Sequence, residues 1–165
     1  MANRGKVFET ELRLSMEQVG MYVERIPDAL FWTGERIASR QTPSDFHAYK
    51  AATNLECFMI EAKAVSGKSL PFNRLEPHQK DALEAFNSFH QNAHGWVAAN
   101  FYDGSNIRQF NRCYMIPIDV WGEYEDKGER KSLSIKQCED DPRIIECPRS
   151  PGSMYDMGAW SGIFI

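Results

Sequence analysis

Hydrophobic residues recur along this chain at two different spacings, and these spacings predict an alternation of helices and strands. Residues 4–20 carry apolar side chains at helical spacing on one stripe, and Gly20 marks the expected end of that helix. A second helix is predicted from Pro77 to about residue 92, because proline suits the first helical turn. Its apolar stripe consists of Ala82, Leu83, Phe86 and Phe89.

Short apolar runs between these helices and after them predict five strands. Three precede the second helix, at residues 22–26, 45–50 and 55–65, and two follow it, at residues 95–102 and 113–118. Asp103-Gly104 signals a hairpin between the last two strands. We expect residues 66–73 to form a loop. This order of elements predicts an α/β fold.

Two segments have less regular patterns. Residues 29–43 contain Phe31 and Trp32 followed by a turn signal, which leaves room for a short hairpin. Residues 122–165 are acidic and rich in loops, and they end in an apolar stretch of the kind that packs on its own domain or on a partner subunit. We therefore predict a core over residues 1–121 and a C-terminal extension over residues 122–165, packed on the core or on a dimer partner.

The composition is that of an ordinary globular protein. The 165 residues suit one domain with a sizeable core, and 42% are hydrophobic and 25% charged. No apolar run approaches the roughly 20 residues of a membrane span, and the N-terminus lacks the apolar stretch of a signal peptide. We therefore expect a cytoplasmic protein with no membrane partner.

The net charge of −4 argues against a simple nucleic-acid binder, but its distribution weakens that argument. Residues 119–165 hold 6 basic and 10 acidic residues, which accounts for the whole excess of negative charge. Residues 1–118 are balanced, and they become locally positive if their carboxylates bind cations.

The four cysteines show no C-x-x-C pairing. Cys57 and Cys113 lie in apolar runs and are expected to be core thiols. Cys138 and Cys147 could in principle join a zinc site, but no paired His or Cys spacing supports one.

Asp45 and the triplet Glu61-Ala62-Lys63 are the main candidates for chemistry. Alternate residues of a strand share a face, so Glu61 and Lys63 point the same way from the end of an apolar strand. Charges there are costly unless they have a partner or a function. Most such triplets are surface salt bridges, but a hairpin would bring Asp45 beside Glu61, and two carboxylates can hold Mg²⁺. With a lysine to orient a water, this set suits metal-assisted phosphodiester hydrolysis.

Four motifs in order resemble the RecU family of Holliday junction resolvases, which belongs to the PD-(D/E)xK nuclease superfamily. They are Asn-Arg-Gly-x-x-Phe-Glu at 3–9, Ser-Asp-Phe at 44–46, Glu-Ala-Lys at 61–63 and His-Gln at 78–79. The resemblance covers roughly residues 3–121. It implies a restriction-endonuclease-like core, with a mixed central sheet flanked by helices. It also implies a homodimer that binds branched DNA, because two symmetric nicks need two sites related by a twofold axis.

The resemblance implies a metal site for Mg²⁺ or Mn²⁺. Asp45 and Glu61 match the metal ligands, and Glu9 matches a helical glutamate that faces the same site. If the first helix is rotated from this register, Glu11 takes the place of Glu9, because the two lie about 200° apart on a helix.

The same resemblance assigns two further residues. Lys63 matches the catalytic lysine, and Gln79 matches the glutamine that follows the active-site strand. From the residues alone, Gln79 could equally satisfy the backbone of a loop.

The chain departs from the family in one segment. The family has a long, partly basic stalk before its active-site aspartate, whereas here only residues 26–44 are available. The short segment and compact size favour a bacteriophage source, and hence action in the host cytoplasm. DNA-backbone contacts are expected from Arg4, Lys6, Arg36 and Arg40, and Lys68 and Arg74 are further candidates.

Three functions therefore remain open from the sequence. The first is a Mg²⁺-dependent endonuclease that resolves Holliday junctions. The second is a nuclease of the same superfamily that acts on forks, flaps or duplex DNA. The third is a non-catalytic DNA-binding accessory protein of recombination on a nuclease fold.

Overall fold

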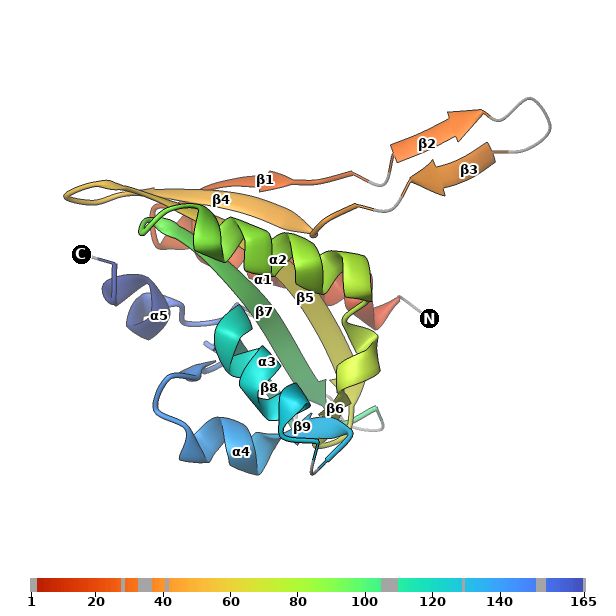
Figure 1. Ribbon diagram of the computed structural model, residues 1–165. Helices are drawn as coiled ribbons and strands as arrows, with labels where there is room; N and C mark the ends of the chain where they lie inside the picture. Colours follow the sequence, from red (N-terminus) through yellow and green to blue (C-terminus); the bar gives the residue numbers. More distant parts are fainter. Residues whose placement is uncertain are drawn as a thin grey trace.

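A six-stranded sheet lies at the centre of the molecule, in the order β1-β4-β5-β7-β8-β10 (Figure 1). Our computed structural model describes residues 3–27, 29–32, 37–40, 42–104, 110–128, 130–150 and 154–164, with only the backbone of 29–32 and 37–40. The strands of the sheet are β1 (Tyr22–Arg25), β4 (Phe46–Ala51), β5 (Leu55–Ser66), β7 (Ala93–Tyr102), β8 (Asn111–Pro117) and β10 (Ile145–Cys147).

One pair of neighbouring strands in this sheet is parallel. β5 and β7 run in the same direction, and the other neighbours are antiparallel. A parallel pair requires a crossover, which here contains α2 (Pro77–Phe89). The crossover brings the carboxyl ends of β5 and β7 to the same edge of the sheet.

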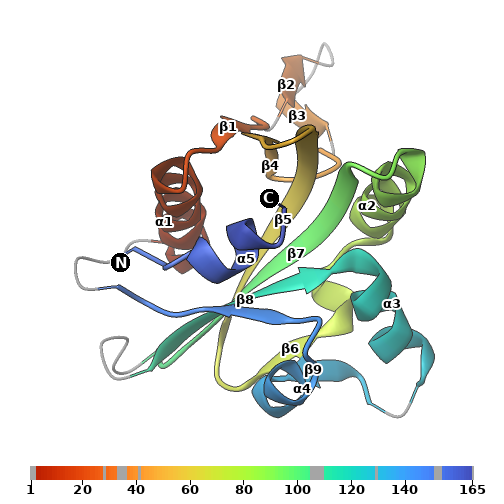
Figure 2. The ribbon, with the colours of Figure 1, turned by 90° about the vertical axis from the view of Figure 1, so that its left-hand side faces the viewer.

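Helices cover both faces of the sheet (Figure 2). α1 (Arg4–Gln18) and α5 (Gly158–Gly162) lie on one face, and α2 and α3 (Ile118–Asp126) lie on the other. Alternate residues of β7 serve the two cores, with Trp96 facing α5 and Val97 facing α2 and α3. Burial on both faces explains why β7 is apolar almost throughout. The predicted α/β class with a mixed central sheet flanked by helices is confirmed, and it is compatible with a restriction-endonuclease-like core.

Residues 66–73 were expected to form a loop, and that prediction is wrong. The segment holds the short strand β6 (Ser69–Pro71) and a 3-10 turn, η1 (Phe72–Arg74). β6 pairs with β9 (Ser132–Ser134), which lies more than 60 residues later in the chain, so no local sequence pattern predicts β6. The predicted apolar stripe of α2 also fails at its end, because Phe89 is 84% exposed.

The segment before Asp45 forms a second, smaller sheet. β2 (Ala29–Trp32) and β3 (Ile37–Arg40) pair antiparallel and extend away from the central sheet, at the upper right of Figure 1. We call this pair the β2–β3 ribbon. It occupies the place at which the sequence left room for a hairpin.

The C-terminal residues pack into the rest of the molecule. α4 (Ile135–Asp140) follows β9, β10 pairs with β8, and α5 places Trp160 against Phe58 and Trp96. Cys113, Cys138 and Cys147 are buried free thiols, and Cys57 is half-buried. Among the helices of the described ranges, none is long and apolar enough to cross a membrane.

Candidate active site

Four of the residues singled out from the sequence line one polar cavity of about 450 Å³. Glu9 reaches it from α1, Asp45 from the residue before β4, and Glu61 and Lys63 from β5. The register of the β4–β5 pair explains the approach of Asp45, since the Asp45 backbone N–H donates to the Ile60 carbonyl at 3.2 Å. The Ala62 N–H in turn donates to Asp45 Oδ2 at 2.9 Å. Asp45 and Glu61 are thereby fixed beside each other.

Glu61 is the most deeply buried of these carboxylates, with 3% of its side chain exposed. Its Oε1 atom accepts hydrogen bonds from Lys63 Nζ and from Gln79 Nε2, both at 2.7 Å. Its Oε2 atom is buried and has no hydrogen-bond partner among the described residues. An unsatisfied carboxylate oxygen in a buried position is costly, and a cation would supply the missing interaction.

The protonation of both carboxyl groups reflects this environment. Burial first, and then the neighbouring Asp45 charge, raise the pKa of Glu61 to about 7, against the opposing effect of Lys63. Burial also raises the pKa of Asp45, while its hydrogen bond from Ala62 lowers it. Burial of two neighbouring acids thus favours one proton, or one cation, between them.

The donor set suits a hard divalent cation. Mg²⁺ is typically bound by one or two carboxylates, with water and substrate phosphate completing its shell. Within the ranges that the structure describes, no three His, Cys, Asp or Glu side chains form a metal-binding cluster. Asp45 and Glu61, with the unsatisfied Oε2 atom, are the residues that would hold Mg²⁺ or Mn²⁺.

Gln79 lies outside the cavity wall but connects its residues. Besides donating to Glu61, its Oε1 atom accepts from Lys63 Nζ at 3.0 Å and from the Glu76 backbone N–H at 3.1 Å. The last contact belongs to the capping box that begins α2. A single side chain therefore ties the start of α2 to Glu61 and Lys63. His78 instead hydrogen-bonds the Thr42 carbonyl at 3.1 Å.

Glu9, and not Glu11, faces the cavity. Glu9 Oε2 is paired with Arg25 at 2.9 Å and with Lys6 at 3.5 Å. Its negative charge acts on Asp45 and raises the pKa of that group. Glu9 thus belongs to the electrostatic surroundings of the two buried carboxylates.

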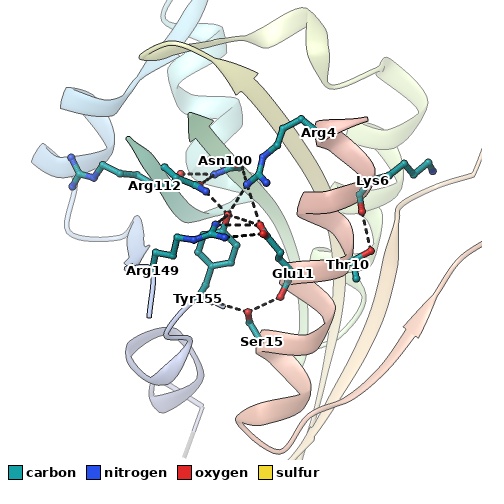
Figure 3. Close-up of polar contacts among 10 residues, drawn as sticks. Arg4, Lys6, Thr10, Glu11, Ser15, Asn100, Arg112, Arg149 and Tyr155 are labelled. Atoms are coloured by element: carbon teal, nitrogen blue, oxygen red, sulfur yellow. Dashed lines mark hydrogen bonds and ion pairs between the residues drawn. The ribbon is translucent and has the colours of Figure 1, made fainter. Parts of the chain in front are cut away.

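Glu11 belongs to a polar network that sequence reasoning did not identify (Figure 3). It accepts from Arg149 at 2.8 Å, from Arg4 at 3.1 Å and from the Tyr155 hydroxyl at 3.3 Å. Arg4 also donates to Asn100 Oδ1 at 3.2 Å. The network fastens the first turns of α1 to β7 and to the C-terminal segment. Arg149 lies 138 positions after Glu11, so no local signal in the sequence could have revealed the pair.

The four predicted DNA contacts fall in different places. Lys6 is exposed at the rim of the cavity, whereas Arg4 lines the cavity but directs its guanidinium into the network around Glu11. Arg40 lies in β3, of which the backbone alone is described, and Arg36 lies outside the described residues. Tyr102 also lines the cavity, as does Arg74, which the sequence offered as a further candidate for a phosphate contact.

No protein-family model matches the chain, and the curated proteins include no significant match to it. The geometry of the cavity therefore carries the functional argument.

Proposed function

We propose that the chain is a Mg²⁺- or Mn²⁺-dependent endonuclease that hydrolyses phosphodiester bonds in branched DNA, as a Holliday junction resolvase does. The observation that carries the proposal is the buried Glu61 carboxylate. One of its oxygens is held by Lys63 and Gln79, and the other is unsatisfied beside Asp45 in an open polar cavity. The motifs that resemble the RecU family support the same activity.

Each residue of the cavity has a role in this proposal. Asp45 and Glu61 hold the cation, which when bound lowers the pKa of a coordinated water and offsets charge on the phosphate. Lys63 Nζ is held by Glu61 and Gln79 at the cavity wall, where it can orient the attacking water or stabilise the developing negative charge. Gln79 positions both side chains. Lys6 and Arg74 lie at the wall as contacts for the phosphate backbone.

The proposal includes a homodimer acting in the cytoplasm. Symmetric nicks across a four-way junction require two active sites related by a twofold axis. Sedimentation of the purified protein with and without junction DNA tests this part. A monomer on the junction would contradict it.

A second candidate is a nuclease of the same chemistry for forks, flaps or duplex DNA. The observation that favours it is the shortness of the β2–β3 ribbon, which spans residues 29–40 where the resembled family has a long stalk. The third possibility, a non-catalytic DNA-binding accessory protein, fits the assembled set of Asp45, Glu61 and Lys63 less well.

One cleavage assay separates these functions. Wild type, Asp45→Asn and Glu61→Gln are incubated with a four-way junction, a Y-fork and a linear duplex, in Mg²⁺ or Mn²⁺. We expect the wild type to cut the junction in preference to the duplex, and both variants to lose cleavage while staying folded. Asp81→Asn, an exposed acid on α2 away from the cavity, is the matched control.

Preferential cutting of the fork would favour the second candidate. Absence of cleavage on every DNA, or full cleavage by Asp45→Asn, would overturn the proposed function.

A further inference from the structure

The cavity at the carboxyl ends of β5 and β7 is the first of three adjoining hollows. The second, of about 480 Å³, shares Ser66 and Tyr102 with the first. The third, of about 330 Å³, shares Lys68 and Phe110 with the second. The three hollows therefore lie side by side from Glu61 and Asp45 past the end of β7 to α4, and we call this row of hollows the depression.

Backbone contacts hold the walls of the middle hollow in place. The Gly67 N–H donates to the Tyr102 carbonyl at 2.8 Å, and the Asp103 N–H donates to the Phe110 carbonyl at 2.9 Å. Gly67 has φ of +109°, a conformation that side chains rarely adopt, so the chain can turn here from β5 toward Lys68. The depression is built from strand ends and the connections between them.

Cations and aromatic rings line this depression together. Tyr102 and Phe110 are half-buried and line the hollows, and Arg4 lies over the Tyr102 ring at 5.6 Å from its centre. Their neighbours in the depression are three exposed cations with no side-chain hydrogen bond or ion pair among the described residues, namely Arg74, Lys68 and Lys136.

The remaining charges of the depression do not cancel this pattern. Arg112 is paired with Glu139 at 2.5 Å and with Glu146 at 2.6 Å, so its charge is not available to a ligand. Asp103 contributes one carboxylate to the middle hollow. Over the described lining of all three hollows, including Glu9, Asp45 and Glu61, seven Lys and Arg side chains stand against five Asp and Glu side chains. The balance is positive, in a protein whose net charge is −4.

Rings and cations that line the same concave surface suit a single DNA strand more than a duplex. The bases of an unpaired strand expose flat faces that stack on aromatic side chains, and its phosphates meet the cations between them. A duplex keeps its bases stacked inside and offers mainly phosphates to a protein surface. A duplex would then bring no base to the rings of Tyr102 and Phe110, which would keep only their contacts with Arg4 and with the core.

We infer that an unpaired DNA strand runs along this depression, which we call the strand track, from Arg74 through Tyr102, Lys68 and Phe110 to Lys136. This inference rests on the proposed function for the nature of the ligand, and it deepens the second candidate of that proposal, because forks and flaps contain unpaired strands whereas a fully paired four-way junction does not. The substrate has a single-stranded segment beside the scissile phosphate, as at the branch point of a flap or splayed arm. Phe110 and Tyr102 stack with its bases, and the three cations contact its backbone.

The test measures binding without cleavage. Fluorescence anisotropy in EDTA compares a labelled oligothymidylate of about 15 nucleotides with a blunt duplex of the same length. We expect the single strand to bind more tightly than the duplex. Lys68→Ala/Lys136→Ala should weaken single-strand binding and lower its salt slope by about 0.7 for each lysine removed. Phe110→Leu should weaken it roughly tenfold, because the ring is lost while an apolar side chain remains.

Matched controls lie outside the strand track. Lys131→Ala removes another exposed lysine, and Phe89→Leu removes a ring that is 84% exposed at the end of α2. Both should bind like wild type. Thermal melting checks the fold of Phe110→Leu, and the lysine pair tests the inference independently because both side chains are exposed.

Equal losses on single strand and duplex would overturn the inference, as would wild-type binding by the lysine pair. Failure of the proposed function is a different result. If no DNA is cut while the track variants lose single-strand binding, the strand track is supported and the proposed nuclease activity is contradicted. If the junction is cut while the track variants bind normally, the strand track alone is wrong.

Discussion

Glu61 is a residue at which stability and the proposed chemistry oppose each other. Its carboxylate is 3% exposed, one of its oxygens has no partner among the described residues, and its pKa is raised to about 7. An ordinary glutamate has a pKa of about 4.5. The folded state therefore binds this proton more tightly than the unfolded state does. The corresponding stability is complete below about pH 4.5 and is lost as the pH rises through about 7.

The upward shift of the Glu61 pKa on folding leads to the first prediction, which concerns the metal-free protein. Glu61→Gln should be more stable than wild type at pH 8, by roughly 2–3 kcal/mol, because glutamine carries no buried charge. The difference should shrink toward zero as the pH falls to 5, where wild-type Glu61 is protonated. Thermal melting of both proteins in EDTA across this range measures the effect.

Addition of Mg²⁺ at pH 8 completes this experiment. The ion should raise the melting temperature of the wild type more than that of Glu61→Gln, since a ligand stabilises the state that binds it. A wild type that is more stable than Glu61→Gln at pH 8 in EDTA would contradict the prediction.

Much of the residue-scale arrangement could be predicted from the sequence. Alternation along the strand at 55–65 placed Glu61 and Lys63 on one face. The motif resemblance assigned Glu9, with Glu11 as the alternative, and Glu9 is the one that lines the cavity. The network of Glu11 with Arg149 and Tyr155 could not be predicted, because charged residues at such separations carry no periodic signal. The sequence assigned Arg4 to DNA, whereas its guanidinium is directed to Glu11.

At the scale of elements, the start of α2 links helix formation to the site. Glu76 and Gln79 form its capping box, in which each side chain accepts from the other residue's backbone N–H. Gln79 also holds Glu61 and Lys63, whereas the Glu76 side chain is exposed and contacts His78 at 3.4 Å. The two residues share the cap and differ in their relation to the cavity.

The second prediction compares the loss of each. Glu76→Ala and Gln79→Ala should each lower the free energy of unfolding by about 1 kcal/mol, because each removes a cap hydrogen bond. Only Gln79→Ala should strongly reduce the rate of DNA cleavage, since it alone releases Glu61 and Lys63. Denaturant melts and single-turnover cleavage measure the two effects. Equal cleavage by both variants would show that Gln79 serves only the helix.

The third prediction concerns the β2–β3 ribbon. It extends from the sheet beside Asp45 and is the element in the position of the resembled family's stalk (Figure 1). Arg36→Ala/Arg40→Ala should reduce affinity for a four-way junction more than affinity for a linear duplex, with a smaller salt slope. Binding at several salt concentrations tests this, with Lys131→Ala as the control for lost charge. An equal loss on both DNAs would reduce these arginines to general electrostatic contacts.

The long elements could be predicted, and the short ones could not. Both long helices and the five predicted strands lie close to their expected ranges. Each of these elements is long enough for its hydrophobic residues to show a helical or strand period. β6, β9 and β10 have three residues each, which is too few to show a period, and their partners lie far away in the sequence. These short strands form because the packed core places their partner strands beside them.

At the scale of the whole molecule, the C-terminal residues complete the core on the α1 face. Trp160 is fully buried against Phe58, Trp96 and Phe164, and Met157 is buried in the same cluster. β10 adds the last strand to the sheet beside β8. The sequence predicted that this apolar segment would pack on the core or on a dimer partner, and these contacts are made within the chain.

The fourth prediction follows from this packing. Trp160→Ala should lower the free energy of unfolding by about 3–5 kcal/mol, because it empties a large buried volume. Ile163→Ala, at the residue directly after α5, changes a side chain that is 56% exposed and should alter the free energy of unfolding by less than about 1 kcal/mol. Urea melts of both variants measure the difference. Similar melts would mean that the α5 region contributes little to the core.

The fastening of α1 by Arg149 and Tyr155 has a consequence for the order in which native contacts form. Glu11 and Arg149 lie 138 positions apart in the chain, and the ring of Phe8 contacts that of Tyr155. Contacts between such distant residues cost loop-closure entropy before they contribute stability, and they form more slowly than local pairings. We therefore expect the network around Glu11 to form late in folding, after β4 has paired with β5.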